Sequence, residues 1–325
     1  MKNKVLIIRL SSFGDIVQCM SVLDSLTGES FDAEVHWLVR SDLLDVPGLS
    51  KKVSKVWAFD RKDGLLGLIK LGLRLRGQGF THIYDAHSSM RSRILCSLLR
   101  PLCLGPKLAR RSKERFKRFL LFSLGINKFP KPFKGMLSYH RPIEKWGIGP
   151  RESFSDSWSF SGGKEFEGIA LAPSAAWEMK RWPLEHWKNL IRELPEQKFV
   201  VLGGPGDSFC KELEEVDSSR VKNLAGKLSL AESCELVSKA PLLVSADTGL
   251  IHVADLLGKK GISLMGPTAF GFATNKNIKT LELDLECRPC TKDGRGNCSQ
   301  EVYQKCMVEL TPEFVARAVR EQLEI

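Results

Sequence analysis

The residues best suited to binding chemistry lie in the second half of the chain, between an apolar run and a helical stretch. Asp247, Thr248 and Gly249 follow the run 242–244, and apolar residues then recur at helical spacing as far as Leu257. The first backbone N–H groups of a helix have no intrahelical partner, so they suit a phosphate. The Asp247 carboxylate could bind a ligand, but Asp is also among the best helix N-caps, and the spacing leaves both interpretations open.

A second carboxylate follows the first apolar run of the chain. Residues 5–10 (VLIIRL) have the composition of a buried strand, and the turn 11–15 (SSFGD) and an apolar helical stretch come after them. Small residues permit a tight turn whose amides point toward a ligand. Asp15 would lie at or just inside the start of the helix, where it could cap the helix and interact favourably with the helix dipole.

Two further polar positions follow predicted strands. Lys180 lies just before a helix with Pro183 at its first position, close to where a ligand pyrophosphate would rest. Asp207 ends the glycine-rich turn 203–207 (GGPGD), which lacks the GxGxxG spacing of a dinucleotide site. Asp207 could bind ribose hydroxyls, although it could equally cap the following helix.

These turns need parallel sheets to position them. Strand-like runs alternate with helical stretches in two series, at 5–10, 34–39, 55–59 and 82–85, and then at 168–172, 199–202, 242–244, 261–265 and 280–285. Such alternation predicts open, mostly parallel sheets that are covered on both faces and bind ligands at the carboxyl ends of their strands. We therefore predict an α/β protein with two Rossmann-like domains facing across a cleft. The domains are 1–155 and 165–310, and residues 127–164, rich in Pro, Gly, Ser and Lys, link them.

The composition restricts the partners and the compartment. A net charge of +11 over 325 residues points to an acidic partner, which could be nucleic acid, anionic lipid or a phosphorylated substrate. The apolar run 5–8 is too short for a signal peptide, and no run reaches membrane-spanning length. We therefore expect a cytoplasmic protein, and nine cysteines, an odd number, fit reduced thiols better than a disulfide framework.

The positive charge is concentrated in residues 107–118 (KLARRSKERFKR). This segment has seven basic residues against one acid, Glu114, and Phe116, Phe119 and Phe122 are interleaved with it or follow it. Adjacent basic and apolar faces suit the headgroup layer of an anionic membrane. The alternative is that the segment is only a solvated charged surface, as most charge runs are.

Four cysteines occur within twenty residues near the C-terminus, at Cys287, Cys290, Cys298 and Cys306. They could form a closed, all-thiolate zinc site. A zinc ribbon would need two CxxC pairs, and this segment has only the pair Cys287 and Cys290. Free or redox-sensitive thiols therefore remain the alternative.

Together, these segments resemble the ADP-heptose lipopolysaccharide heptosyltransferases, glycosyltransferase family 9. The matching segments are VLIIRLSSFGDIV (5–17), DAHSSMRS (85–92), MKRWPLEHW (179–187), LVSADTGLIHVA (243–254), SLMGPT (263–268), ECRPC (286–290) and LTPEFV (310–315). They occur in the family's order and extend over nearly the whole chain, which is more specific than any one of them.

The resemblance implies a GT-B fold that binds the nucleotide sugar mainly with its C-terminal domain, and a terminal helix, 311–325, that packs back on the first domain. It implies that Asp15 is the general base, that Lys180 contacts the donor phosphates and that Asp247 reaches the sugar hydroxyls. The other implied donor-binding residues are Thr248, Gly249, His252, Ser174, Asp207 and Leu228, where Leu228 and Asp207 correspond to adenine and ribose contacts. On the acceptor side we assign Ser11, Ser12, Gly14, Arg91 and Arg93. Some heptosyltransferases carry hydroxyl residues where this chain has Ala175 and Ala176, and Ser174 could substitute for them.

The reaction implied is transfer of a heptose from ADP-heptose to the inner core of lipopolysaccharide, with inversion at the anomeric carbon. No Asp-x-Asp metal signature occurs in the matching segments, so we expect a metal-independent mechanism without a required cofactor. The implied acceptor is anionic and lipid-linked, so the protein would associate peripherally with the cytoplasmic face of the inner membrane. One alternative is a related transferase that uses another nucleotide sugar. Another is a basic, zinc-containing nucleic-acid-binding protein, which we disfavour because the aromatic residues form no recognised RNA-binding motif.

Overall fold

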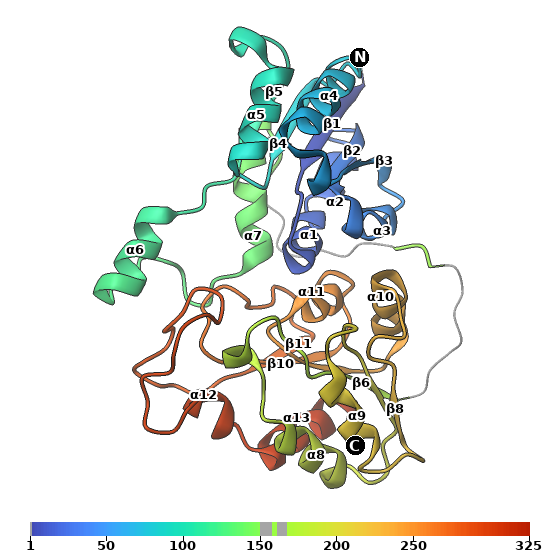
Figure 1. The fold of residues 1–325 in the computed structure, drawn as a ribbon, viewed down its shortest axis with the longest axis vertical. Helices are drawn as coiled ribbons and strands as arrows, with labels where there is room; N and C mark the ends of the chain where they lie inside the picture. Colours follow the sequence, from blue (N-terminus) through green and yellow to red (C-terminus); the bar gives the residue numbers. More distant parts are fainter. Residues whose placement is uncertain (1, 150–157, 161–167) are drawn as a thin grey trace. The chain divides into compact units, whose positions relative to one another are not determined.

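The computed structural model describes residues 2–149, 158–160 and 168–325. The chain divides into two compact units, the first formed by Met1–Glu114 and Met136–Phe160 and the second by Arg115–Gly135 and Ser161–Ile325 (Figure 1). Both predicted domain boundaries, 155 and 165, lie outside the described residues, as do residues 150–157 and 161–164 of the predicted link.

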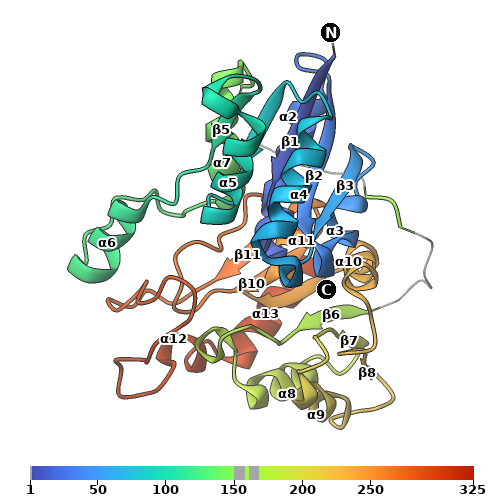
Figure 2. The same ribbon diagram turned by 45° about the horizontal axis from the view of Figure 1, so that its top comes forward.

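The first unit contains a five-stranded parallel sheet in the order β3-β2-β1-β4-β5. Its strands are β1 (Asn3–Ile8), β2 (Ala33–Arg40), β3 (Val53–Phe59), β4 (His82–Asp85) and β5 (Lys107–Arg110). Its helices are α1 (Phe13–Met20), α2 (Leu23–Thr27), α3 (Asp45–Gly48), α4 (Gly64–Arg76), α5 (Met90–Leu99) and α7 (Gly135–His140), with 3₁₀ turns at Ser41–Leu43, Arg61–Asp63, Pro101–Cys103 and Arg141–Trp146. The central strand β1 is apolar because neighbours cover both of its faces. Helices α4 and α5 cover one face of this sheet, where Leu68 and Leu95 join the core with Leu6 and Leu38 (Figure 2).

The second unit contains a six-stranded parallel sheet in the order β11-β10-β9-β6-β7-β8. Its strands are β6 (Ile169–Ala172), β7 (Phe199–Val201), β8 (Val221–Asn223), β9 (Leu243–Ala246), β10 (Gly261–Leu264) and β11 (Ile278–Leu281). Its helices are α6 (Arg115–Leu124), α8 (Leu184–Glu193), α9 (Lys211–Glu214), α10 (Leu230–Lys239), α11 (Gly249–Leu256), α12 (Lys305–Val308) and α13 (Pro312–Leu323), with 3₁₀ turns at Glu178–Lys180 and Ser208–Cys210. The predicted pair of parallel α/β units is therefore confirmed.

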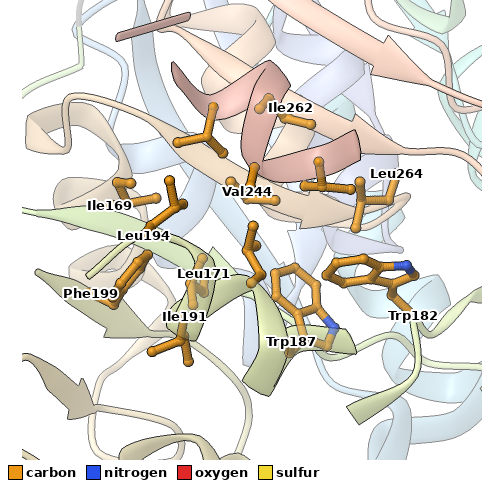
Figure 3. Close-up of a cluster of buried hydrophobic side chains, with 14 of the residues drawn as sticks. Ile169, Leu171, Trp182, Trp187, Ile191, Leu194, Phe199, Val244, Ile262 and Leu264 are labelled. Atoms are coloured by element: carbon orange, nitrogen blue, oxygen red, sulfur yellow. The ribbon is translucent and has the colours of Figure 1, made fainter. Parts of the chain in front are cut away.

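The core of the second unit lies between this sheet and helices α8 and α13. Apolar residues from the strands meet two tryptophans, Trp182 and Trp187, whose rings are 5.0 Å apart and nearly perpendicular (Figure 3). The indole N–H of Trp182 donates to the carbonyl of Leu310 at 2.8 Å, so its one polar atom is satisfied inside the core.

The terminal helix contributes to the core of the second unit. Helix α13 packs on α8, and its apolar face, including Val315 and Val319, belongs to that core. The expected packing of residues 311–325 on the first domain stays a prediction. Thr311 caps this helix by accepting from the amide of Phe314, and Pro312 occupies its first turn. The apolar periodicity predicted the helix correctly but did not indicate which core receives it.

The basic segment 107–118 is not one element. Residues 107–110 form β5, an edge strand of the first unit, whereas Arg115–Leu124 form α6 of the second unit. The predicted first domain, 1–155, included residues 115–135, which the structure groups with the second unit. The physical reason is an aromatic cluster in which Phe270 contacts Phe122, Phe129 and Phe133 at ring separations of 5.1–6.0 Å. Among the described residues, no helix is long and apolar enough to cross a bilayer.

Candidate functional site

The carboxylate of Asp247 is the centre of the site in the second unit. Strand β9 ends at Ala246 between β6 and β10, so the loops that follow all three strands reach one edge of the sheet. From the β6 side, the Lys180 ammonium lies 2.8 Å from Asp247 Oδ2. From the β10 side, the hydroxyl of Thr268 donates to the same oxygen at 2.7 Å. His252, in α11, places Nε2 4.0 Å from Oδ1.

These contacts test the capping interpretation of Asp247. The N-cap position of α11 belongs to Thr248, and the carboxylate of Asp247 is bound by side chains. The capping interpretation is therefore wrong. Burial acts to raise the pKa of Asp247, but the charges of Lys180 and His252 and the hydrogen bonds from Lys180 and Thr268 hold that pKa below its ordinary value.

The loop after β10 approaches Asp247 more closely than the sequence indicated. A Cβ atom at Gly271 would lie 2.0 Å from Asp247 Oδ1, so a side chain at this position requires the carboxylate or the loop to move. The far end of the loop is held by Asp255, a buried residue of α11 that accepts from the amides of Thr274 and Asn275 at 2.7–3.0 Å. Burial raises the pKa of Asp255 to about 6.

The sequence analysis did not assign a role to Thr268, Gly271 or Asp255. A signal existed for Asp255, because a carboxylate within the apolar run of a buried helix needs donors. Thr268 was visible only as part of the SLMGPT segment. Nothing in the spacing of Gly271 indicates its contact with Asp247, because the contact depends on how the loop folds.

The other predicted donor residues follow neighbouring strands of the same sheet. Ser174 comes after β6, Asp207 after β7 and Leu228 after β8, and each is half-buried. The carboxylate of Asp207 accepts from the amide of Gly204 at 2.7 Å, which closes the glycine-rich turn upon itself. The hydroxyl of Thr248, at the start of α11, lies 3.0 Å from that of Ser245. The structure thus brings these residues to one edge of the second sheet.

The carboxylate of Asp15 lies in the first turn of α1, in the first unit. Its Oδ2 is 2.5 Å from the guanidinium of Arg9, at the end of β1, and accepts from the Ser12 hydroxyl at 2.8 Å. Its Oδ1 accepts from the phenol of Tyr139, in α7, at 2.9 Å. The Asp15 side chain is 38% exposed, so one side of it remains accessible to a ligand.

Several charges act on Asp15. Burial acts to raise the pKa of Asp15, but Arg9, the Ser12 hydroxyl, Arg111 and Tyr139 hold it well below its ordinary value. Arg111 also stacks on Tyr139, with its guanidinium carbon 4.0 Å from the ring centroid. No sequence pattern indicated the contacts of Arg111 and Tyr139 with Asp15, and no role was predicted for Arg9. Arg9 was detectable, because a basic residue within a buried strand requires a partner.

The predicted acceptor-side residues divide into two groups. Ser11, Ser12 and Gly14 lie in the turn that positions Asp15. Arg91 and Arg93 are exposed in the first turns of α5, after β4, which is the neighbour of β1. All five residues therefore follow adjacent strands of the first sheet.

The four C-terminal cysteines are thiols in differing environments. Cys306 is buried, which raises its pKa to about 11, whereas Cys290 is exposed and Cys287 and Cys298 are half-buried. Within the described ranges, no group of three or more His, Cys, Asp or Glu residues is arranged to hold a metal ion. The zinc site stays a prediction.

Known proteins resemble this chain along most of its length. The model of glycosyltransferase family 9 (heptosyltransferase) matches residues 68–300. Lipopolysaccharide heptosyltransferase 1 of Pseudomonas aeruginosa is 25% identical over 313 residues, which cover 89% of this chain and 86% of that protein. Lipooligosaccharide heptosyltransferase 2 of Campylobacter jejuni is 26% identical over 162 residues, 47% of this chain, and the chain spans 50% of that relative's length.

A solved structure supports the fold. The structure of the E. coli heptosyltransferase WaaC with ADP has a TM-score of 0.71 at 19% identity, covering 98% of this chain and 99% of that one. This likeness concerns the fold, a GT-B type with two parallel-sheet α/β units. Because the family match extends over more than half of the sequence, the chain belongs to glycosyltransferase family 9 (heptosyltransferase).

Proposed function

We propose that this protein transfers a heptose from ADP-heptose to the inner core of lipopolysaccharide, with inversion and without a metal cofactor. The observation that carries the proposal is the Asp247 site, where an anion, a lysine and a helix start converge at the carboxyl edge of the second sheet. Relatives named as lipopolysaccharide heptosyltransferases support the reaction, and a structure of WaaC with ADP supports the nucleotide.

The donor would occupy the edge of the second sheet. Lys180 and the amides at the start of α11 would bind the diphosphate, since both supply positive charge without a divalent cation. Asp247 would accept hydrogen bonds from the sugar hydroxyls. Ser174, Asp207 and Leu228 would contact the nucleotide, because they follow β6, β7 and β8 in turn.

The acceptor hydroxyl would be deprotonated by Asp15. As its oxygen bonds to the anomeric carbon, its proton passes to the Asp15 carboxylate, and the bond from the anomeric carbon to the phosphate oxygen breaks. The electron pair leaves with ADP, whose charge Lys180 and the α11 amides stabilise. Attack opposite the leaving group inverts the anomeric carbon, so the mechanism requires no covalent enzyme intermediate.

The acceptor class rests on charge. The net charge of +11 favours an anionic acceptor, and a lipid-linked one would be reached at the cytoplasmic face of the inner membrane. Helix α6 exposes Phe116 and Phe119 and is one candidate surface for peripheral attachment. The four-cysteine zinc site, if present, would be structural and lies outside this chemistry.

The test is transfer by the purified protein from ADP-heptose to defined core acceptors, with product linkage and anomeric configuration determined by NMR, in the presence and absence of a chelator. Transfer that a chelator leaves unchanged supports the proposal. A parallel thermal-shift series with ADP, UDP and GDP separates the donors, because a ligand present at 100 times its Kd stabilises the folded state by about 2.7 kcal/mol. Selective stabilisation by UDP or GDP would instead favour a transferase for another nucleotide sugar.

A further inference from the structure

Helix α4 presents a surface that the proposed reaction does not use. Its sequence, GLLGLIKLGLRLR, buries Leu68, Gly72 and Leu75 against the first sheet and α5. A Cβ atom at Gly72 would lie 2.8 Å from the side chain of Leu98, so α4 approaches α5 closely along this face. The packing fixes which residues of α4 point away from the core.

The opposite face of α4 is apolar. Leu66 and Leu73 are 74% and 57% exposed, and the half-buried Ile69 lies at helical spacing between them. Leu65 is also exposed, but it lies in the first turn, above Leu68 on the core side of the helix. A solvated helix face is normally polar. Two exposed leucines with Ile69 between them, rimmed by charged residues, indicate an interaction surface.

The rim of this face is mainly basic, with four exposed cations against the exposed N-cap carboxylate of Asp63. Lys62, Lys70, Arg74 and Arg76 are exposed on or beside α4. In the part of the chain that the structure describes, the side chains of these four residues form no ion pair. Their charge is therefore available to an anionic partner.

We propose that the outer face of α4 docks on an anionic lipid bilayer, with the helix lying in the plane of the headgroups. Leu66 and Leu73 would enter the boundary between headgroups and acyl chains, and the cations on and beside the helix would bind lipid phosphates. Thirteen residues rise about 20 Å, enough to lie across several lipids. The inference deepens the proposed function, because it assigns the surface by which a transferase for a lipid-linked acceptor meets the membrane.

Co-sedimentation of the full chain with vesicles tests the proposal, using phosphatidylglycerol mixed with phosphatidylethanolamine against phosphatidylcholine alone. Leu66→Gln with Leu73→Gln should weaken binding to the anionic vesicles at least about tenfold, since it removes apolar burial. Lys70→Gln, Arg74→Gln and Arg76→Gln together should weaken it about 100-fold at low salt, with a smaller loss at high salt. The matched control is Phe314→Gln with Arg317→Gln, an exposed aromatic and basic pair on α13, which should bind like the wild type.

Two outcomes overturn the proposal. Equal pelleting of the wild type and both α4 variants with anionic vesicles would overturn it. If Phe116→Gln with Phe119→Gln then abolished pelleting, the membrane contact would belong to α6. A concentration-dependent dimer that Leu66→Gln with Leu73→Gln dissolves would assign the face to a second copy of the chain. All substituted side chains are exposed, so circular dichroism and thermal unfolding should confirm that every variant folds.

Transfer to a soluble, delipidated acceptor keeps this proposal separate from the proposed function. The α4 variants should retain wild-type rates with that acceptor. If the wild type binds anionic vesicles through α4 yet transfers no heptose, the reaction assignment fails and the docking surface stands.

Discussion

Each unit holds a carboxylate paired with a cation, but the two pairs differ in how firmly the cation is fixed. The Arg9 guanidinium that binds Asp15 is buried and also donates to the carbonyl of Ala86 at 2.8 Å. The Lys180 ammonium that binds Asp247 ends a flexible stem on a short 3₁₀ turn. Arg9 is therefore a fixed part of the Asp15 site, whereas we expect Lys180 to exchange Asp247 for the phosphate of the proposed donor.

The difference indicates two uses of the same chemistry. A carboxylate held by an anchored arginine stays ionised and in place, which suits a group that must receive a proton in a defined geometry. The charge of a carboxylate paired with a lysine is compensated while no ligand is bound. We expect ligand binding to replace the lysine–carboxylate ion pair with a lysine–phosphate ion pair. The largest predicted effects follow from this contrast.

Asp15→Asn removes the proton acceptor while keeping its shape. We expect turnover to fall by about 10²–10⁴, the range for loss of a general base, while donor affinity stays unchanged. Steady-state kinetics and ADP titration measure both quantities. Because the pKa of Asp15 lies below its ordinary value, the wild-type pH–rate profile should show no acidic limb from Asp15 above about pH 4. An Asn variant with wild-type rates across the pH range would remove Asp15 from the mechanism.

Substitutions of the exchangeable pair should have opposite effects on the nucleotide. Lys180→Ala should weaken ADP binding about 10–100-fold, because it removes a charge-assisted contact of about 1.5–3 kcal/mol. Asp247→Ala should maintain or strengthen ADP binding, since Lys180 is then unpaired, but weaken binding of the whole ADP-sugar. Calorimetric titration with both ligands measures the contrast. Equal losses for ADP and ADP-sugar in Asp247→Ala would show that Asp247 acts only structurally.

Asp255 supplies a third carboxylate, and its hydrogen-bond donors are backbone amides. Its pKa is raised from 3.8 to about 6, so the folded state binds the proton more tightly than the unfolded state does. The free energy of unfolding should therefore fall as pH rises from about 4 to about 6, by an amount on the order of 2–3 kcal/mol. Asp255→Asn should remove this dependence, and urea unfolding at several pH values measures it. A wild type and an Asn variant with parallel pH profiles would contradict the assignment.

Gly271→Ala should cause the smallest of the predicted changes, a modest loss of ADP-sugar affinity. The added Cβ must displace the Asp247 carboxylate or the loop, so we expect a severalfold loss of ADP-sugar affinity with ADP affinity retained. Gly48→Ala, in α3 of the first unit, is the matched control, because a Cβ there meets no atom within 4 Å. Calorimetric titration of both variants with ADP and with the ADP-sugar measures the two affinities. Identical behaviour of the two variants would show that the loop adapts without moving Asp247.

Local sequence patterns predicted the sheets, most strands and the carboxylate turns. They succeeded because a buried parallel strand is a short apolar run, and because the turn after it carries small and polar residues. The same reasoning missed β8 (VKN), whose three residues are too few and too polar to form a recognisable run. It also could not place the terminal helix or residues 115–135, since an apolar face does not specify which core receives it.

The environment of each carboxylate depended on contacts between distant residues. Tyr139 reaches Asp15 across 124 positions, and Thr268 reaches Asp247 across 21. No spacing rule links such positions, because the strand order of the sheet brings them together. The ionisable residues could therefore be named from the sequence, whereas their hydrogen-bond donors, and so their pKa directions, required the structure.

The aromatic cluster around Phe270 has a consequence for recombination between relatives. Residues 115–135 precede most of the second unit in sequence, yet their phenylalanines pack within it. A chimaera made by one crossover near residue 160 would combine Phe270 from one parent with Phe122, Phe129 and Phe133 from the other. Two crossovers that transfer residues 115–135 together with 161–325 keep the cluster intact. The second unit is thus encoded by two separate segments of the sequence. Substitutions that preserve its aromatic cluster must be compatible between positions about 150 residues apart, such as Phe122 and Phe270.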